Sequence, residues 1–219
     1  MKKIFLIILI FVSSSVFATT FDDFYRAINS NDLQKIKQLI SNNKGINSKS
    51  DKVDLTLKLE SGSSVLMMAA AKGNNEIVKM LIDSGADIHS LDSKQDTVLM
   101  VASINGHNDI VATLLQSGVN INAKNDKGET ALIWSTLAGH TDIVKTLIKY
   151  KVDVNIKNNA GLSALVYAVM GKRPDLVKIL LDANADIKAT LSGISLLALA
   201  KSNNDKETIN LLKKAGATQ

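Results

Sequence analysis

The chain repeats one short motif four times at intervals of 33 residues. The copies begin at Ser64, Thr97, Thr130 and Ser163, and a run of mostly apolar residues follows each of these hydroxyl residues. A fixed period of about 20–50 residues indicates stacked units, each too small to bury its own apolar face. The period therefore predicts a repeat protein, and it favours binding over catalysis.

Residues 125–157 show what one unit contains. A turn at Asp126 and Gly128 precedes Thr130, which is placed to cap a short helix by accepting backbone N–H bonds. This helix is expected to end at Gly139, because glycine adopts a left-handed backbone at little cost. A second helix follows with one apolar stripe, and an extended segment leads to the next turn. Each unit is therefore predicted to consist of a turn, two helices and a finger.

These units resemble the ankyrin repeat, whose consensus places Thr-Pro-Leu-His in the first helix and Gly-His before the second. The second-helix motif recurs at Gly73–Leu81, Gly106–Leu115 and Gly139–Ile148, and the finger motif recurs at Ser84–Ile88, Ser117–Asn122 and Val152–Asn155. The resemblance extends from about Phe21 to the C-terminus. It implies an all-α ankyrin-repeat solenoid of about six helix-turn-helix units with short hairpin-like fingers.

We expect the repeat domain to span residues 19–219, with a polar cap at each end. Its units are expected at about residues 21–47, 60–91, 92–124, 125–157, 158–189 and 190–219.

An insertion at about residues 48–59 separates the first two units. The alternation from Val53 to Glu60 predicts a half-buried strand, so this finger is expected to fold as a small hairpin. It is either a tolerated loop insertion or an edge with which a partner strand pairs.

Two departures from the ankyrin consensus concern the strength of the stack. The consensus proline is absent from every unit, and Lys172-Arg173 replaces Gly-His in unit five, just before the only proline, Pro174. A residue other than glycine in a left-handed conformation costs roughly 1 kcal/mol or more. We therefore expect units five and six to be the less stable end of the stack.

The first 18 residues resemble a secretory signal peptide. Lys2 and Lys3 precede an unbroken apolar run, Ile4–Val12, and small residues precede the expected cleavage point after Ala18. The run is too short to cross roughly 30 Å of hydrocarbon; the alternative is a buried N-terminal helix. We expect a periplasmic or secreted chain with no membrane insertion after cleavage.

Composition argues against a nucleic-acid partner. The formal net charge is +5, and it falls to +3 once Lys2 and Lys3 are removed. All basic residues except Arg26 and Arg173 are lysines, which offer point charges instead of bidentate phosphate contacts. The chain also lacks cysteine and can form no disulfide.

Catalysis has little support in the sequence. His107 and His140 share one repeat position, where the resemblance implies a scaffold role, and His89 lies at a finger tip without the partners of a metal site. Phosphate-binding and dinucleotide-binding glycine patterns are missing. An enzyme would need a site within residues 48–60, where only Ser, Asp and Lys are available. We predict a non-enzymatic protein without cofactor or metal.

By resemblance, partners bind the concave face formed by the fingers and the first helices. One column of this face should form an apolar strip of increasing bulk; the alternative for its three larger members is packing between repeats. The expected contact residues are Ala71, Lys72, Lys94, Asp96, Ile104, Asn105, Lys127, Glu129, Leu137 and Met170. Trp134 and Tyr167 are candidate anchors, but Met68 and Val101 hold the same position, so we interpret this second column as packing.

The predicted function is that of an exported ankyrin-repeat scaffold that holds a protein partner in its concave face. We expect a monomer. Narrower alternatives, implied by the family, are a periplasmic protective or immunity protein that neutralises a toxin or assists peroxide defence, and a secreted effector that captures a host protein. A structural spacer without a specific partner is the alternative of a different class.

Overall fold

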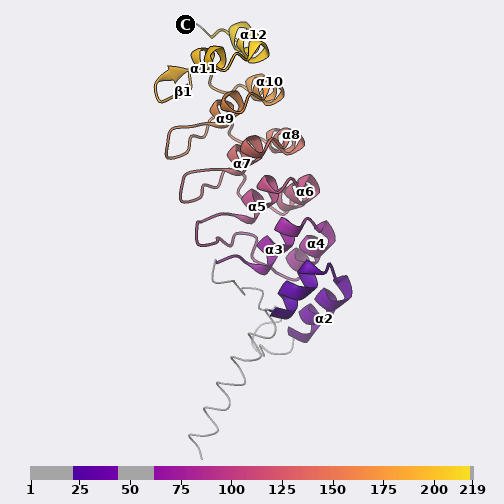
Figure 1. Cartoon of the computed structure of the whole chain (residues 1–219). Helices are drawn as coiled ribbons and strands as arrows, with labels where there is room; N and C mark the ends of the chain where they lie inside the picture. The colour runs from indigo at the N-terminus through magenta and orange to yellow at the C-terminus, as the bar shows by residue number, and fades with distance from the viewer. Residues whose placement is uncertain (1–21, 44–61, 218–219) are drawn as a thin grey trace, which may run out of the picture.

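The computed structural model describes residues 22–43 and 62–217, which form six pairs of helices stacked along one direction (Figure 1). The first helices of the pairs are residues 22–29, α3 (Val65–Lys72), α5 (Val98–Ile104), α7 (Ala131–Ala138), α9 (Ala164–Met170) and α11 (Leu196–Ser202). The second helices are α2 (Leu33–Asn43), α4 (Asn75–Asp83), α6 (Asn108–Gln116), α8 (Thr141–Lys149), α10 (Pro174–Asp182) and α12 (Lys206–Lys214). The predicted signal peptide and the 48–59 insertion lie outside the described residues.

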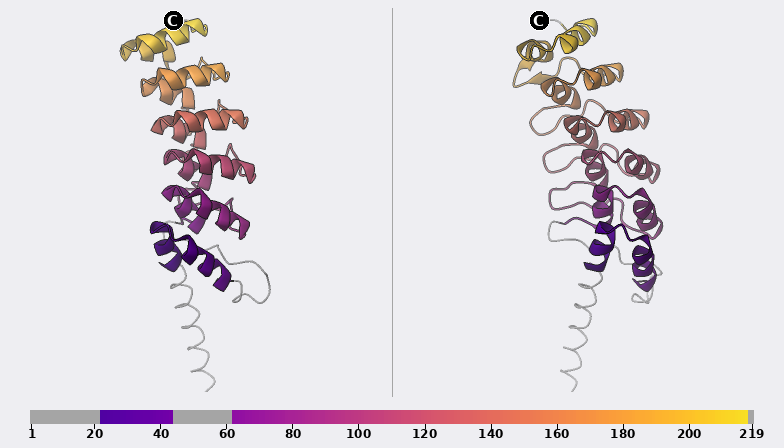
Figure 2. Two further views of the ribbon diagram at one scale, coloured as in Figure 1. Left: turned by 90° about the vertical axis from the view of Figure 1, so that its right-hand side faces the viewer. Right: turned by 45° about the vertical axis from the view of Figure 1, so that its right-hand side comes forward.

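The stack has three layers, which Figures 1 and 2 show from different sides. Fingers form one edge, the first helices lie in the middle, and the second helices form the opposite layer. Neighbouring first helices contact one another from α3 to α11, and so do neighbouring second helices from α4 to α12. The predicted all-α repeat solenoid is therefore confirmed.

Strand pairing within the described residues is limited to the fingers. The last finger is a hairpin of β1 (Thr190–Leu191) and β2 (Ile194–Ser195), in which Thr190 pairs with Ser195 and Leu191 pairs with Ile194. An isolated bridge between Leu91 and Thr97 closes an earlier finger.

The repeated hydroxyl residues begin the first helices, as the sequence predicts. The side chains of Ser64, Thr97 and Thr130 each accept a hydrogen bond from the backbone N–H three residues later. Such caps satisfy one of the N–H groups that a helix leaves open at its start. Ser163 occupies the same position but its side chain makes no capping bond.

The core lies between the two helix layers and continues through all the described repeats. Its most regular column comprises Leu66, Leu99, Leu132 and Leu165, all at most 1% exposed. Because these residues recur every 33 positions, each repeat supplies the same apolar surface to its neighbour. Packing between repeats thus buries what one helix pair would leave in water.

Side chains at the start of the second helices bind backward to the preceding repeat. The Nε2 atom of His107 lies 3.1 Å from the Ala71 carbonyl oxygen, and that of His140 lies 3.0 Å from the Ile104 oxygen. A carbonyl oxygen can only accept, so Nε2 must carry the proton. The scaffold role that the resemblance implied for these histidines agrees with this geometry.

Arg173 takes the place of histidine in unit five. Its guanidinium donates a 2.9 Å bond to the Gly139 carbonyl oxygen, so the arginine preserves the link to the repeat before it. Lys172, which replaces the glycine, has a φ of 52° and adopts the left-handed conformation that its position requires. The greater softness of units five and six stays a prediction.

We expect Gly139→Ala to destabilise the stack more than Gly85→Ala. Both glycines have positive φ, which costs an alanine about 1–2 kcal/mol. A Cβ at Gly85 would meet nothing within 4 Å, whereas one at Gly139 would displace the Arg173 guanidinium. Losing that bond should add about 1–2 kcal/mol, measured by urea unfolding. Equal losses in the two variants would mean that Arg173 moves aside without cost.

Candidate protein-binding face

The free side of the first helices faces the fingers. In α7, Trp134 and Leu137 are three residues apart and therefore share one side of the helix. The Trp134 indole N–H donates a 3.0 Å bond to the Glu129 carboxylate in the adjoining finger. In α9, the Tyr167 hydroxyl accepts a 3.0 Å bond from the Asn158 side-chain amide in its own finger. This side of the helices and the fingers together form the concave face.

Large apolar side chains remain exposed on this face. Leu137 is 59% exposed and Met170 is 41% exposed, although both belong to helices whose other apolar residues are largely buried. Ala71 is exposed and Ile104 is half-buried at the equivalent positions. We call these four residues the concave strip. Packing between repeats leaves Leu137 and Met170 largely in solvent, and exposed apolar residues that line up are typical of interaction surfaces.

The neighbouring column behaves differently. Met68, Val101, Trp134 and Tyr167 are half-buried and pack against the core. The polar atoms of the two aromatic residues bond to fingers, as described above. This agrees with the interpretation of the column as packing between repeats.

Backbone bonds join neighbouring fingers. The Asp126 N–H donates to the Lys94 carbonyl at 3.0 Å, and the Asn159 N–H donates to the Lys127 carbonyl at 2.9 Å, one repeat later. The side chains of Lys94 and Lys127 are exposed. The two lysines are therefore held in place through their backbones while their ammonium groups stay available to a partner.

Asp96 lies in a different environment from the other expected contact residues. It is only 5% exposed, and its Oδ1 accepts a 2.7 Å hydrogen bond from the Asn125 side-chain amide of the next finger. A buried carboxylate cannot serve as a surface contact without rearrangement. Asp96 therefore joins two fingers in this structure, contrary to the expectation of an exposed side chain.

Asn125 organises the finger network and was absent from the expected site. Its Oδ1 accepts backbone bonds from Lys127 and Glu129 at 3.0 and 2.9 Å, while its amide reaches both Asp96 and, at 3.4 Å, Glu129. Asp92 and Asn158 hold the equivalent turns with the same backbone bonds. The spacing of these three residues at 33 positions was the available sequence signal.

Burial raises the pKa of the Asp96 carboxyl above its ordinary value of 3.8. The hydrogen bond from Asn125 opposes this shift, nearby Asp92 adds to it, and Lys94 opposes it. Asp96 therefore carries its charge at neutral pH at some cost to the folded state.

The remaining expected contacts lie at the edges of the strip. Lys72 and Asn105 are exposed at the ends of α3 and α5, and Asn105 bonds its own helix through the Val101 carbonyl. Glu129 is half-buried and occupied by Trp134 and Asn125. The structure thus gathers an apolar strip with lysines at its borders, whereas the acidic members are engaged within the scaffold.

Two searches of the described residues bear on other functions. No group of three or more His, Cys, Asp or Glu residues in this part of the chain is arranged to hold a metal ion. No helix among the described residues is long and apolar enough to span a membrane.

We expect Asp96→Asn to make the protein more stable at pH 7, because the amide still accepts the Asn125 bond without a buried charge. As pH falls, the wild-type carboxyl binds its proton in the folded state before it does so in the unfolded state. The wild type then gains relative stability, and the advantage of the variant should shrink from pH 7 to pH 4. Urea unfolding at several pH values tests this, and a less stable variant at pH 7 would contradict it.

Comparison with known proteins agrees with this geometry. A family model of ankyrin repeats (three copies) matches residues 24–125 and 118–191. The crystal structure of an ankyrin repeat domain from Acinetobacter baumannii AYE is 32% identical, with a TM-score of 0.78 over 89% of this chain and 98% of that chain. A search of curated proteins finds no match. The chain therefore belongs to the ankyrin-repeat family.

Proposed function

We propose that the chain is an exported, non-catalytic scaffold that binds a protein partner through its concave face. Ankyrin repeats are generally protein–protein interaction scaffolds. The observation that carries the proposal is the exposure of Leu137 and Met170, at 59% and 41%, on adjacent first helices. A spacer would have no need to hold such side chains in solvent.

The energetics of the strip favour a partner that covers it. Burial of a large apolar side chain stabilises by about 1.5–3 kcal/mol relative to exposure. Two neighbouring residues of this kind could form the centre of an interface, with Lys94 and Lys127 at its polar rim. The column beneath the strip is packed against the core, so the surface is held rigid before a partner arrives.

We expect the double variant Leu137→Arg, Met170→Glu to lose its partner. The two changes place charges at the centre of the proposed interface, where they would be desolvated without counter-ions. The purified chain is used as bait in extracts of its own organism, and the retained protein is identified by mass spectrometry. Its affinity for the variant should fall at least about 100-fold, which corresponds to about 2.7 kcal/mol.

The matched control is Gln116→Arg, Asn210→Glu. It introduces the same two charges at exposed positions in the layer of second helices, and it should bind like the wild type. Equal binding by both double variants and the wild type would remove the concave strip from the interface. A chain that retains no specific protein would favour the spacer alternative.

Export is the second part of the proposal and rests on the basic start, the apolar run and the small residues before Thr19. When the full chain is expressed in a bacterium, the product in the periplasm or medium should begin at Thr19. Ala18→Arg should block cleavage, because the peptidase reads a small residue at that position. N-terminal sequencing of both products measures this. A wild-type product that keeps Met1 and stays in the cytoplasm would contradict export.

A further inference from the structure

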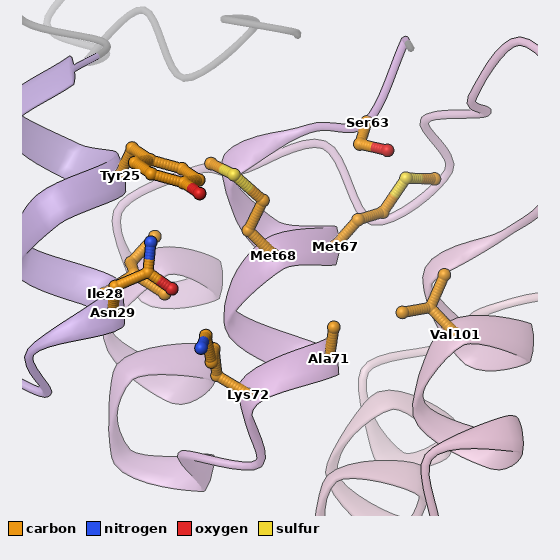
Figure 3. A pocket seen from close by; sticks show the side chains of 9 residues that line it. All are labelled: Tyr25, Ile28, Asn29, Ser63, Met67, Met68, Ala71, Lys72 and Val101. Carbon is orange, nitrogen blue, oxygen red and sulfur yellow. The ribbon is translucent and has the colours of Figure 1, made fainter.

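A pocket of about 400 Å³ opens on the concave face at the first end of the strip (Figure 3). It lies between the helix of residues 22–29 and α3, and Val101 of α5 closes one side. Its volume falls within the range of about 300–1,000 Å³ that is usual for ligand-binding pockets. The lining residues are Tyr25, Ile28, Asn29, Ser63, Met67, Met68, Ala71, Lys72 and Val101.

A small side chain in the strip explains why the hollow lies here. Ala71 is the strip's smallest member, and the equivalent positions in later repeats hold Ile104, Leu137 and Met170. Those larger side chains occupy space that Ala71 leaves open. The pocket is thus continuous with the strip and is its one alanine-lined part.

The pocket combines an apolar floor with polar groups that are not engaged elsewhere. Met67 and Ile28 are buried, and Met68 is half-buried. Methionine is flexible and polarizable, and it adapts readily to the shape of an apolar ligand group. No hydrogen bond or ion pair within the described residues engages the Tyr25 hydroxyl or the Lys72 ammonium group.

Charge decides which partner chemistry fits. Lys72 is the only charged residue that lines the pocket, and it is exposed at the C-terminal end of α3. Its ammonium group donates hydrogen bonds but accepts none. An occupant with a carboxylate near its apolar group satisfies Lys72, and a cationic occupant is repelled.

We infer that this pocket receives an anchor from the protein partner, namely a bulky apolar side chain with a carboxylate beside it. The carboxylate pairs with Lys72 while the side chain lies on the methionine floor. This inference rests on the proposed function, because the partner that binds the strip supplies the anchor.

The first arm of the test needs no partner and measures the chemistry of the pocket. The probes are 4-phenylbutyrate, 4-phenylbutan-1-ol and 4-phenylbutylamine, which share one apolar group and differ in charge. Binding is followed by NMR of methionine methyl groups in the purified chain. Met67 and Met68 should shift, while Met80 and Met170, which do not line the pocket, should not.

Affinity should follow charge and pocket size. The carboxylate should bind up to about fivefold more tightly than the alcohol, as expected for an exposed ion pair, and the amine should bind most weakly. Lys72→Gln should abolish the preference for the carboxylate. Ala71→Ile should abolish binding of all three probes, and its fold is protected by precedent, because Ile104 holds the same position one repeat later. Circular dichroism checks the fold.

Matched controls come from the opposite end of the stack. Ala198→Ile and Lys201→Gln change an exposed alanine and an exposed last-turn lysine of α11, and they should bind the probes like the wild type. Equal affinity for the carboxylate and the amine would overturn the inference. So would Ala71→Ile retaining the probes, or probe binding that appears only when residues 48–59 are deleted, since this chain would then cover its own pocket.

The second arm uses the partner identified with the wild-type bait. Ala71→Ile should weaken its binding at least about tenfold, and Lys72→Gln up to about fivefold, with the α11 variants unchanged. If the Leu137, Met170 double variant loses the partner while Ala71→Ile keeps it, only the anchor inference fails. If the wild type retains no partner, the proposed function fails, and the inferred protein anchor fails with it even where the probes bind.

Discussion

Contacts between neighbouring repeats hold the molecule together, because its helices are too short to be stable alone. The named helices contain between 7 and 11 residues. Isolated helices shorter than about 12–15 residues are marginal in water. Their stability must therefore come from the leucine column that passes through the stack and from the side chains that bind backward to the preceding carbonyl. The concave face exists only because several repeats are aligned by these contacts.

Much of this arrangement could be predicted from the sequence, because local chemistry specifies it. Thr130 caps a helix wherever its hydroxyl precedes an apolar run, and Gly139 ends one because a left-handed backbone suits glycine. Repetition at 33 residues then extends one local solution to the whole stack. The exposure of Leu137 follows from the same register, since its position falls on the free side of each first helix.

Other features depend on what a neighbouring repeat contributes and could not be read from one unit. Asp96 is polar and lies in a turn, yet Asn125 from the next finger covers it. Arg173 looks like the loss of a histidine, but its longer side chain still reaches the Gly139 carbonyl. The pocket at Ala71 likewise depends on a helix that precedes α3 by a long segment of chain. In each case the deciding partner is distant in the sequence and close in space.

The ladder of bonds between fingers separates two kinds of evolutionary change. Its rungs between repeats use the carbonyls of Lys94 and Lys127 and the N–H groups of Asp126 and Asn159, which any residue except proline can supply. The outward side chains at these positions carry no part of that ladder. Selection can therefore exchange them to suit a new partner while the spacing of the fingers stays the same. Drift in recognition need not be limited by folding here, whereas at Asn125 the two would change together.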